Sequence, residues 1–336
     1  MKAYEVQNTN GVDALALVER SEPKPSFGQV LVRVRATSLN YRDLLVVQGL
    51  YGSKQKLPLI PLSDGAGEVV AVGGGVTKVK VGDRVAGIFF QNWLAGTLTQ
   101  EKIKSDLGGS IDGMLTEYAV LNQDGLVLLP EHLSYQEGST LPCAAVTAWH
   151  ALTCQSGITA GETVLLLGTG GVSIFALQFA KLQGAKVIIT SSSDEKLEQA
   201  KQLGATEIIN YKTTPDWEKR VYEITNGVGV DQVVEVGGAG TLAKSMRAAR
   251  LGGKISLIGV LSGAAGEVNP LPIIMKKLVM QGIYVGSREI FEAMNRAISL
   301  HQLKPVINRV FPLTEAPAAY NYLHSGQHFG KVVIQL

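Results

Sequence analysis

The sequence predicts an α/β protein in which a barrel-like β region precedes a doubly wound parallel sheet. Residues 1–124 consist of short apolar runs separated by turns, without helical periodicity. Residues 162–193 read as strand, glycine turn, helix and second strand, which together form a βαβ unit. After that unit, strand-like runs alternate with helix-like segments, as in a parallel sheet with helices on its faces.

Length and composition limit the class of protein. A chain of 336 residues exceeds the roughly 250–300 residues at which single cores stop growing, so we expect two domains. With 46% hydrophobic and 18% charged residues the chain is globular, and a net charge of +2 argues against nucleic acid or an anionic membrane as partner. The sequence lacks an apolar leader and any apolar run of about 18 residues, so we expect a cytoplasmic protein.

The amino-terminal region contains several short strands. Between Val30 and Arg35, valines alternate with other residues, which indicates a half-buried strand. Residues 63–68 lead into a second strand at Val69–Val72, and the turn at Gly82-Asp83 leads into a third. Strands at spacings of roughly ten residues favour a compact β-barrel.

The βαβ unit follows helical segments expected at 135–141 and 144–154. Val164–Leu167 is a buried strand, and the apolar residues from Val172 to Ala180 recur with helical spacing. Gly184 ends this helix, and Val187–Thr190 is the second strand.

The glycine turn of this unit has the chemistry of a dinucleotide site. Gly168 permits a tight turn, and Gly170 lets backbone N–H groups approach a pyrophosphate. The helix beginning near Gly171 offers unpaired amides and the positive end of its dipole to the same anion. Ser173 replaces the last glycine of the usual fingerprint, and an ordinary strand-to-helix turn without a ligand is the alternative interpretation.

The remaining chain continues the alternation and then returns to helices and a strand. Expected strands lie at 208–209, 233–236, 254–258 and 278–285, and expected helices at 217–225 and 242–249. The tail has helices at 290–300 and 316–324 and a strand at 331–335, which we expect to fold with the first domain.

Several motifs are spread along the chain: Gly65-Ala66-Gly67, Val81-Gly82-Asp83-Arg84-Val85, Leu141-Pro142-Cys143 with Thr147, Gly168-Thr169-Gly170-Gly171-Val172 and Ile283-Tyr284-Val285-Gly286-Ser287-Arg288. With these motifs the chain resembles the medium-chain dehydrogenase/reductases over nearly its whole length. The resemblance implies a GroES-like β-barrel catalytic domain at residues 1–124 and 289–336, interrupted by a Rossmann domain at residues 125–288. It also implies a nicotinamide cofactor in the cleft between the domains, and a homodimer.

Zinc-containing members of this family carry a Cys-His-x-Asp run, which falls here on Asn40-Tyr41-Arg42-Asp43. Their zinc-binding His falls on Ser63, so only Cys143 remains of the usual ligands. Asn and Ser are weak neutral ligands for zinc, and the lobe with four cysteines is missing as well. We therefore expect no zinc, and read Cys143 as a small apolar side chain, with a reactive thiol as the alternative.

The sequence is similar to the zinc-free branch with quinone oxidoreductases and enoyl reductases. In that branch the residues matching Asn40 and Tyr51 line the pocket by the nicotinamide, although Tyr51 also reads as a turn residue facing solvent. The resemblance places the following further residues at the cofactor: Thr147, Gly168, Thr169, Gly170, Gly171, Val172, Ile258, Gly259, Val260, Ser287 and Arg288. A salt bridge at the domain edge is the alternative for Arg288.

The end of the second strand of the βαβ unit indicates which nicotinamide is bound. Dinucleotide folds that prefer NAD carry an acidic residue there, and Ser191 stands in its place. Lys196 lies one turn later, and Tyr211 matches a tyrosine that contacts a 2′-phosphate in similar quinone reductases, which favours NADPH over NADH. Asp194 and Glu195 count against this assignment, and Lys196 also reads as a solvated helix residue.

These observations predict hydride transfer from NADPH to a quinone or an α,β-unsaturated carbonyl. Asn40 and Tyr51 are the expected catalytic residues, which stabilise or protonate the enolate or hydroquinone oxygen. The alternatives are an alcohol dehydrogenase of the same family acting on a small alcohol or aldehyde, and a non-catalytic NADPH-binding protein such as a lens crystallin or an RNA-binding protein. The small net charge offers little attraction to RNA.

Overall fold

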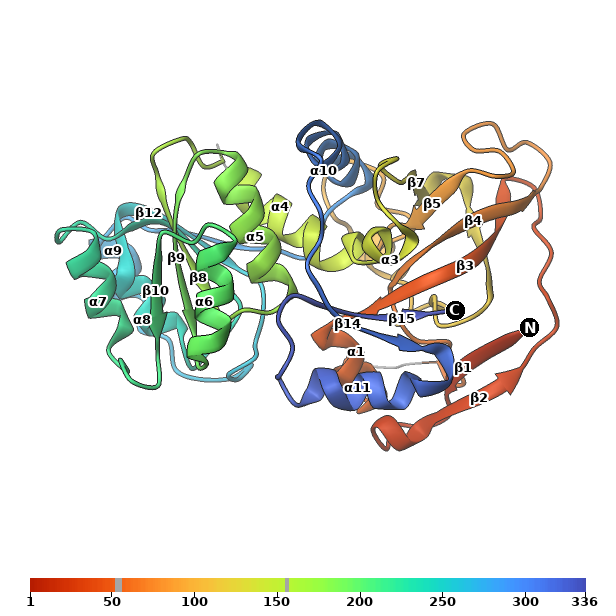
Figure 1. The fold of residues 1–336 in the computed structure, drawn as a ribbon, viewed down its shortest axis with the longest axis horizontal. Helices are drawn as coiled ribbons and strands as arrows, with labels where there is room; N and C mark the ends of the chain where they lie inside the picture. The colour runs from red at the N-terminus through yellow and green to blue at the C-terminus, as the bar shows by residue number, and fades with distance from the viewer. Residues whose placement is uncertain (52–55, 155–156) are drawn as a thin grey trace. The chain divides into compact units, whose positions relative to one another are not determined.

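The computed structural model describes residues 1–51, 56–154 and 157–336. The chain forms two compact units, the first made of Met1–Val146 with Val285–Leu336 and the second of Thr147–Tyr284 (Figure 1). The sequence placed the domain boundaries at residues 124 and 289. The first boundary lies later along the chain because the helix at Tyr135–Ser139 packs against strands of the first unit.

The first unit is built on a mainly antiparallel sheet. Its central strand, β3, pairs along one edge with β4 and along the other edge with both β6 and β15. The last strand of the chain, β15, therefore lies in the same sheet as β3 and β4, between β14 and β3. The strands of this unit are β1 (Lys2–Val6), β2 (Leu15–Glu19), β3 (Gln29–Leu39), β4 (Asp64–Val72), β5 (Arg84–Gly87), β6 (Tyr118–Asn122), β7 (Leu126–Leu128), β14 (Ile307–Pro312) and β15 (Lys331–Gln335).

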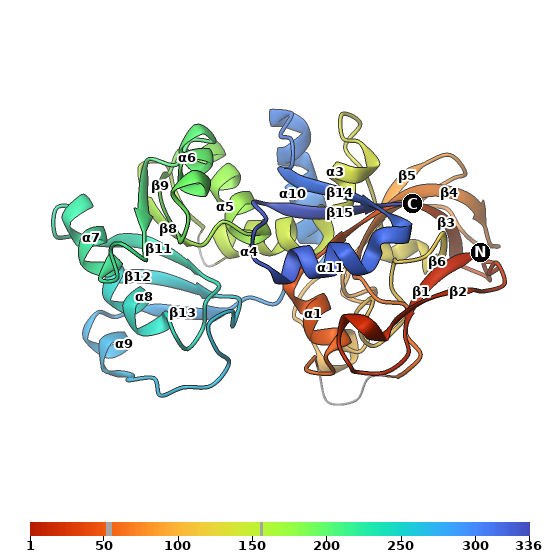
Figure 2. The same ribbon diagram turned by 60° about the horizontal axis from the view of Figure 1, so that its bottom comes forward.

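Helices cover this sheet, and the sequence analysis expected none before residue 125, so it missed α1 and the shorter α2. The two turns of α1 hold too few residues to show a helical period, although Asn40 begins this helix and Asp43 reaches back to the Asn40 backbone. α1 packs beside α11, as Figures 1 and 2 both show, around a core that includes Leu39, Leu44 and Tyr320. The helices and helical turns are η1 (Val12–Ala14), α1 (Tyr41–Val47), α2 (Gln100–Ile103), η2 (Gln123–Gly125), α3 (Tyr135–Ser139), the π-helical turn η3 (Leu141–Ala145), α10 (Arg288–His301), η4 (Leu313–Glu315) and α11 (Ala316–His324).

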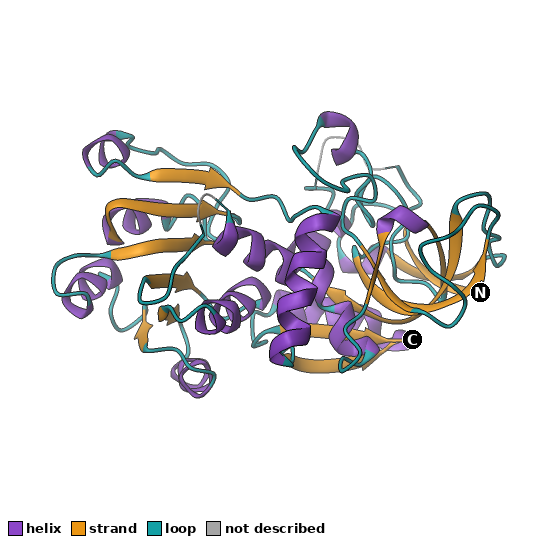
Figure 3. Cartoon of the chain, turned by 90° about the horizontal axis from the view of Figure 1, so that it is seen from above, coloured by secondary structure: helices purple, strands orange, loops and turns teal. Residues whose placement is uncertain are grey.

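The second unit is a parallel sheet in the order β10-β9-β8-β11-β12-β13, with helices on both faces (Figure 3). The order reverses direction between β8 and β11, where ligands bind in doubly wound sheets. Leu165 and Leu167 of β8 pack with Trp217 and Met246 in one core layer. Its elements are α4 (Val146–Thr153), β8 (Thr163–Leu167), α5 (Gly171–Leu182), β9 (Lys186–Ser191), α6 (Asp194–Gln202), β10 (Glu207–Asn210), α7 (Trp217–Ile224), β11 (Val230–Glu235), α8 (Leu242–Ala248), β12 (Ala249–Leu257), α9 (Leu271–Met275) and β13 (Val279–Gly282).

The expected fold class is confirmed: a GroES-like β unit accompanies a Rossmann unit. Within the described ranges, no helix has both the length and the apolar character needed to cross a membrane.

Candidate active site

A cluster of buried polar side chains lies in the first unit where β3 ends, β4 begins and β15 begins. Sheet register brings it together, since Ser38 stands opposite Asp64 and Leu39 opposite Val332. Eight residues are grouped here as the polar cluster: Ser38, Asn40, Arg42, Asp43, Ser63, Asp64, Asp106 and Lys331.

Lys331 is the cation at the centre of this cluster, and its side chain is 2% exposed. Its Nζ donates to the carbonyl oxygen of Leu39 at 2.7 Å, to Asn40 Oδ1 at 2.6 Å and to Asp64 Oδ2 at 3.4 Å. The Asp64 carboxylate also accepts the hydroxyls of Ser38 at 2.9 Å and Ser63 at 3.1 Å. The buried charges are thus paired and hydrogen-bonded, as burial of ions requires.

Asn40 stands at the amino end of α1 with its carboxamide in the cluster. Its backbone N–H donates to Asp43 Oδ2 at 2.7 Å, which fixes the start of the helix. Its Oδ1 accepts from Lys331, whereas its Nδ2 is buried and has no hydrogen-bond partner among the described residues. A buried N–H without a partner is costly, so this donor is poised for a ligand.

Arg42 lies against both Asp43, which accepts the Asn40 backbone N–H, and Tyr51, the second expected catalytic residue. Its guanidinium lies 4.2 Å from the centroid of the Tyr51 ring and donates to Asp106 Oδ2 at 2.8 Å. Stacking of this kind holds an aromatic ring in place. Burial raises the pKa of the neighbouring Asp43 to about 6, against the attraction of the Arg42 guanidinium.

The Arg42–Asp106 pair supports the cluster, and we expect Asp106→Ala to lower the free energy of unfolding of the first unit by about 3 kcal/mol. The substitution leaves a buried guanidinium without its closest carboxylate. Glu68→Gln is the control, because the Arg35–Glu68 pair is half-exposed and its loss costs less than about 1 kcal/mol. Hydrogen exchange of first-unit amides in increasing urea measures the free energy of unfolding of both variants. Equal losses of stability in the two variants contradict the structural role of the Arg42–Asp106 pair.

The polar cluster does not have the donor set of a zinc site. The oxygen of Asn40 faces an ammonium group, and the hydroxyl of Ser63 donates to Asp64. Burial and the neighbouring Asp64 raise the pKa of the Cys143 thiol, which favours its neutral form rather than a thiolate ligand. Over residues 1–51, 56–154 and 157–336, no group of three or more His, Cys, Asp and Glu side chains is arranged to hold a metal ion.

The glycine turn lies at the carboxyl end of β8 in the second unit. Gly168 has a φ of 74°, and no atom lies within 4 Å of the position a Cβ would occupy. Gly170 caps α5, whose first amides therefore remain available to an anion. Ser173, in place of the third glycine, donates to the Leu167 carbonyl at 2.7 Å and so ties the helix to the strand. The turn with Thr169 and Val172 thus fits a pyrophosphate.

Three expected cofactor residues gather at the carboxyl ends of β9 and β10. Ser191 is buried, and its carbonyl accepts the Tyr211 backbone N–H at 3.1 Å. The Tyr211 side chain is 41% exposed, and Lys196 lies in the first turn of α6 after the cap Ser193. Partial burial lowers the pKa of Lys196. Asp194 accepts a hydrogen bond from Asn210 at 2.7 Å, so part of the opposing negative charge is engaged.

Glu235 is a residue that the sequence analysis missed. It ends β11 fully buried, and its Oε1 accepts backbone N–H groups of Gly237 at 2.7 Å and Gly238 at 3.0 Å. Its backbone carbonyl accepts from Ile258 at 2.8 Å, which holds the segment with Gly259 and Val260 beside this turn. The sequence signal that could have identified Glu235 is a single acidic residue between an apolar run and two glycines.

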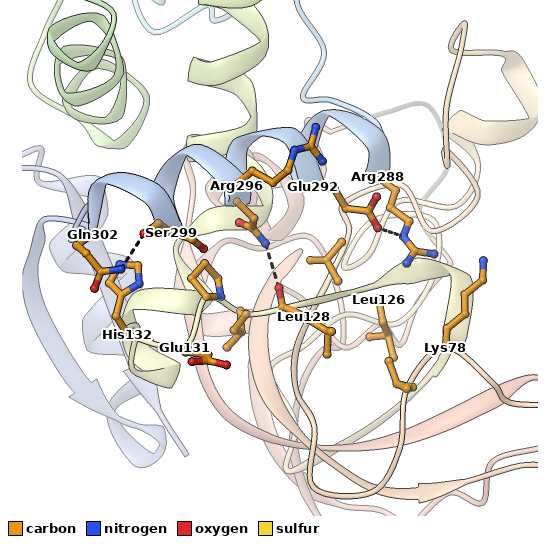
Figure 4. A pocket seen from close by; sticks show the side chains of 15 residues that line it. Lys78, Leu126, Leu128, Glu131, His132, Arg288, Glu292, Arg296, Ser299 and Gln302 are labelled. Atoms are coloured by element: carbon orange, nitrogen blue, oxygen red, sulfur yellow. Dashed lines mark hydrogen bonds and ion pairs between the residues drawn. The ribbon is translucent and has the colours of Figure 1, made fainter.

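Three further expected cofactor residues lie away from the glycine turn and the ends of β9 and β10, namely Thr147, Ser287 and Arg288. Thr147 is buried near the start of α4 in the second unit. Ser287 caps α10 by accepting the Ile290 N–H, and Arg288 pairs with Glu292 Oε1 at 2.8 Å. Figure 4 shows this pair beside a groove of about 950 Å³ in the first unit, along α10, that contains no residue of the polar cluster. The alternative interpretation of Arg288, a salt bridge, agrees with these contacts.

Comparison with known proteins locates the chain among oxidoreductases. The model of an alcohol dehydrogenase GroES-like domain matches residues 26–131, and that of a zinc-binding dehydrogenase matches residues 171–299. A zinc-type alcohol dehydrogenase-like protein of Schizosaccharomyces pombe is 46% identical over 97% of this chain and 96% of its own length.

Two solved structures are similar along the entire chain. An NAD-dependent alcohol dehydrogenase has a TM-score of 0.91 and 34% identity, with 100% of both chains covered. The Escherichia coli quinone oxidoreductase complexed with NADPH has a TM-score of 0.86 and 25% identity, also with 100% of both chains covered. With these relatives and both domain models, the chain belongs to the medium-chain dehydrogenase/reductase superfamily of oxidoreductases.

Proposed function

We propose that this protein is a zinc-independent, NADPH-dependent reductase of quinones or α,β-unsaturated carbonyls. The observation that carries the proposal is Nδ2 of Asn40, a buried hydrogen-bond donor that has no partner among the residues the structure describes. The charged groups around it are paired. Such a donor suits an oxygen that gains negative charge during reduction.

The second unit supplies the residues that would hold the dinucleotide. The turn from Gly168 to Val172 and the amino end of α5 suit the pyrophosphate, and Ser191 with Lys196 and Tyr211 suits a 2′-phosphate. When bound, the reduced nicotinamide supplies a hydride. Ser191 favours NADPH because a carboxylate at this position would repel the phosphate, whereas a hydroxyl can donate to it.

The first unit supplies the groups that act on the acceptor. The Asn40 Nδ2 donates to the substrate oxygen, and this donation stabilises the negative charge that forms on that oxygen. The Tyr51 hydroxyl, on a ring held by Arg42, gives its proton to the same oxygen. Conjugated acceptors need less electrophilic help than a simple carbonyl, so these two groups suffice without a metal.

A zinc-dependent alcohol dehydrogenase is the second candidate, because the Schizosaccharomyces pombe relative is named zinc-type and a structural neighbour is named an alcohol dehydrogenase. The donor set at Asn40 and Ser63 argues against it. Metal analysis of the purified protein, with alcohol oxidation assayed with and without added zinc, separates the two. One tightly held zinc per chain, needed for turnover, supports the dehydrogenase.

Lys196 gives the cofactor preference a direct test. We expect Lys196→Ala to lower the preference for NADPH over NADH about tenfold, which corresponds to about 1.4 kcal/mol, because the ammonium faces the 2′-phosphate. Lys201→Ala is the matched control, since Lys201 is exposed in the last turn of the same helix. Titration of each variant with both reduced cofactors, followed by nicotinamide fluorescence, measures the ratio. An unchanged ratio in Lys196→Ala contradicts the assignment.

We also propose a homodimer formed through the edge of the second unit. β13 is the last strand in the sheet order, so within the described chain one of its edges lacks a partner strand. Val279 and Tyr284 beside it are 43% and 42% exposed. An unpaired edge with exposed apolar side chains favours pairing with a second copy. Light scattering of the purified protein, with Val279→Lys for comparison, tests this proposal.

A further inference from the structure

The contact between Lys331 and Asn40 determines how the Asn40 amide is turned. An ammonium group has three donors and no acceptor, so only the oxygen of the carboxamide can face it. The 2.6 Å distance from Lys331 Nζ to Asn40 Oδ1 is that of a strong charge-assisted hydrogen bond. The opposite end of the amide, Nδ2, is thereby turned away from Lys331.

The ammonium of Lys331 is itself fully engaged. Its three donors have three acceptors, namely the Leu39 carbonyl, Asn40 Oδ1 and Asp64 Oδ2. The Asp64 carboxylate is held in turn by the hydroxyls of Ser38 and Ser63. Lys331 therefore has no proton left for a substrate, and any effect on the reaction passes through Asn40.

We propose that Lys331 is a positioning residue that locks the Asn40 carboxamide with its N–H donors toward the acceptor oxygen. This inference rests on the proposed function, in which Asn40 Nδ2 binds that oxygen. Without Lys331, rotation by about 180° about the last side-chain bond becomes available, because the two ends of an amide have nearly the same shape. The rotated amide presents an oxygen to the developing negative charge, which opposes the reaction.

The test uses Lys331→Met/Asp64→Asn, in which the cation and its counter-charge are removed together so that no buried charge is left unpaired. Asp64→Asn alone provides the reference rate. We expect kcat for enone or quinone reduction to fall about 30-fold below this reference. This fall is smaller than the loss of about 10²–10³-fold that follows complete removal of one oxyanion donor. The dissociation constant for NADPH stays within about twofold, since the turn at Gly168 is in the other unit.

The same change in an Asn40→Leu background separates positioning from a general structural effect. If Lys331 acts through Asn40, removing Lys331 and its counter-charge there lowers kcat by less than about threefold, since the pair is coupled. An equal fall in both backgrounds shows that Lys331 only supports the fold, and no fall in either shows that it does not position the amide.

A spectroscopic readout makes the test independent of any substrate. In protein labelled with ¹⁵N-asparagine, the Asn40 side-chain amide signals are assigned by their loss in Asn40→Leu. We expect them to shift in Lys331→Met/Asp64→Asn relative to Asp64→Asn, because the amide loses its charged partner. Unshifted signals overturn the inference. A shift in a protein that reduces no quinone or enone instead refutes the proposed function while leaving the Lys331–Asn40 contact in place.

Discussion

Asn40→Leu is expected to lower kcat for quinone and enone reduction by about 10²–10³-fold, the loss that follows removal of one oxyanion donor. Leucine has a similar size but cannot donate a hydrogen bond. The substitution removes Nδ2, which has no partner among the described residues, and it also removes Oδ1, which accepts from Lys331 Nζ. Steady-state kinetics with NADPH and a quinone or enone measure the change.

The control for this prediction is Asn40→Asp, which keeps the shape and the contact with Lys331 but presents only acceptor atoms when ionised. We expect it to lose as much activity as Asn40→Leu, with affinity for NADPH unchanged within about twofold in both variants. Retention of most of the wild-type kcat in either variant contradicts the role of Asn40 as a donor.

Tyr51→Phe is expected to lower kcat by about 10²-fold, at the lower end of what a general acid contributes. Phenylalanine retains the ring that stacks with Arg42 at 4.2 Å, so the substitution removes only the hydroxyl. Steady-state kinetics with NADPH and a quinone or an enone measure the loss.

Tyr135→Phe is a matched control for Tyr51→Phe. The Tyr135 ring also lies against an arginine, with Arg84 at 4.8 Å from its centroid, but it lies outside the polar cluster. We expect its kcat to equal that of the wild type. If Tyr51→Phe behaves like Tyr135→Phe with every quinone and enone tested, Tyr51 is not the proton donor.

Local sequence signals were sufficient to predict the parallel sheet of the second unit. The apolar strand at Val164–Leu167, the turn at Gly168 and the following helix are contiguous in sequence, and the structure forms them as β8 and α5. In the first unit, α1 was missed because its seven residues contain about two turns, too few to display a helical period.

The polar cluster could be predicted only in part. Asn40 and Tyr51 were found through a resemblance to a family motif, whereas Lys331 has no local signal in the strand it begins. Its role depends on the antiparallel pairing of β15 with β3, which brings together residues separated by 291 positions. Register of this kind is set by the whole sheet, so a single sequence does not reveal it.

The most direct test of zinc-independent reduction measures NADPH oxidation by purified protein of known zinc content against a panel of quinones, enones and small alcohols or aldehydes. We expect protein with less than about one-tenth of a zinc per chain to oxidise NADPH with a quinone or an enone, and a chelator to leave the rate unchanged. Turnover that appears only with zinc, and only with alcohols or aldehydes, contradicts this expectation.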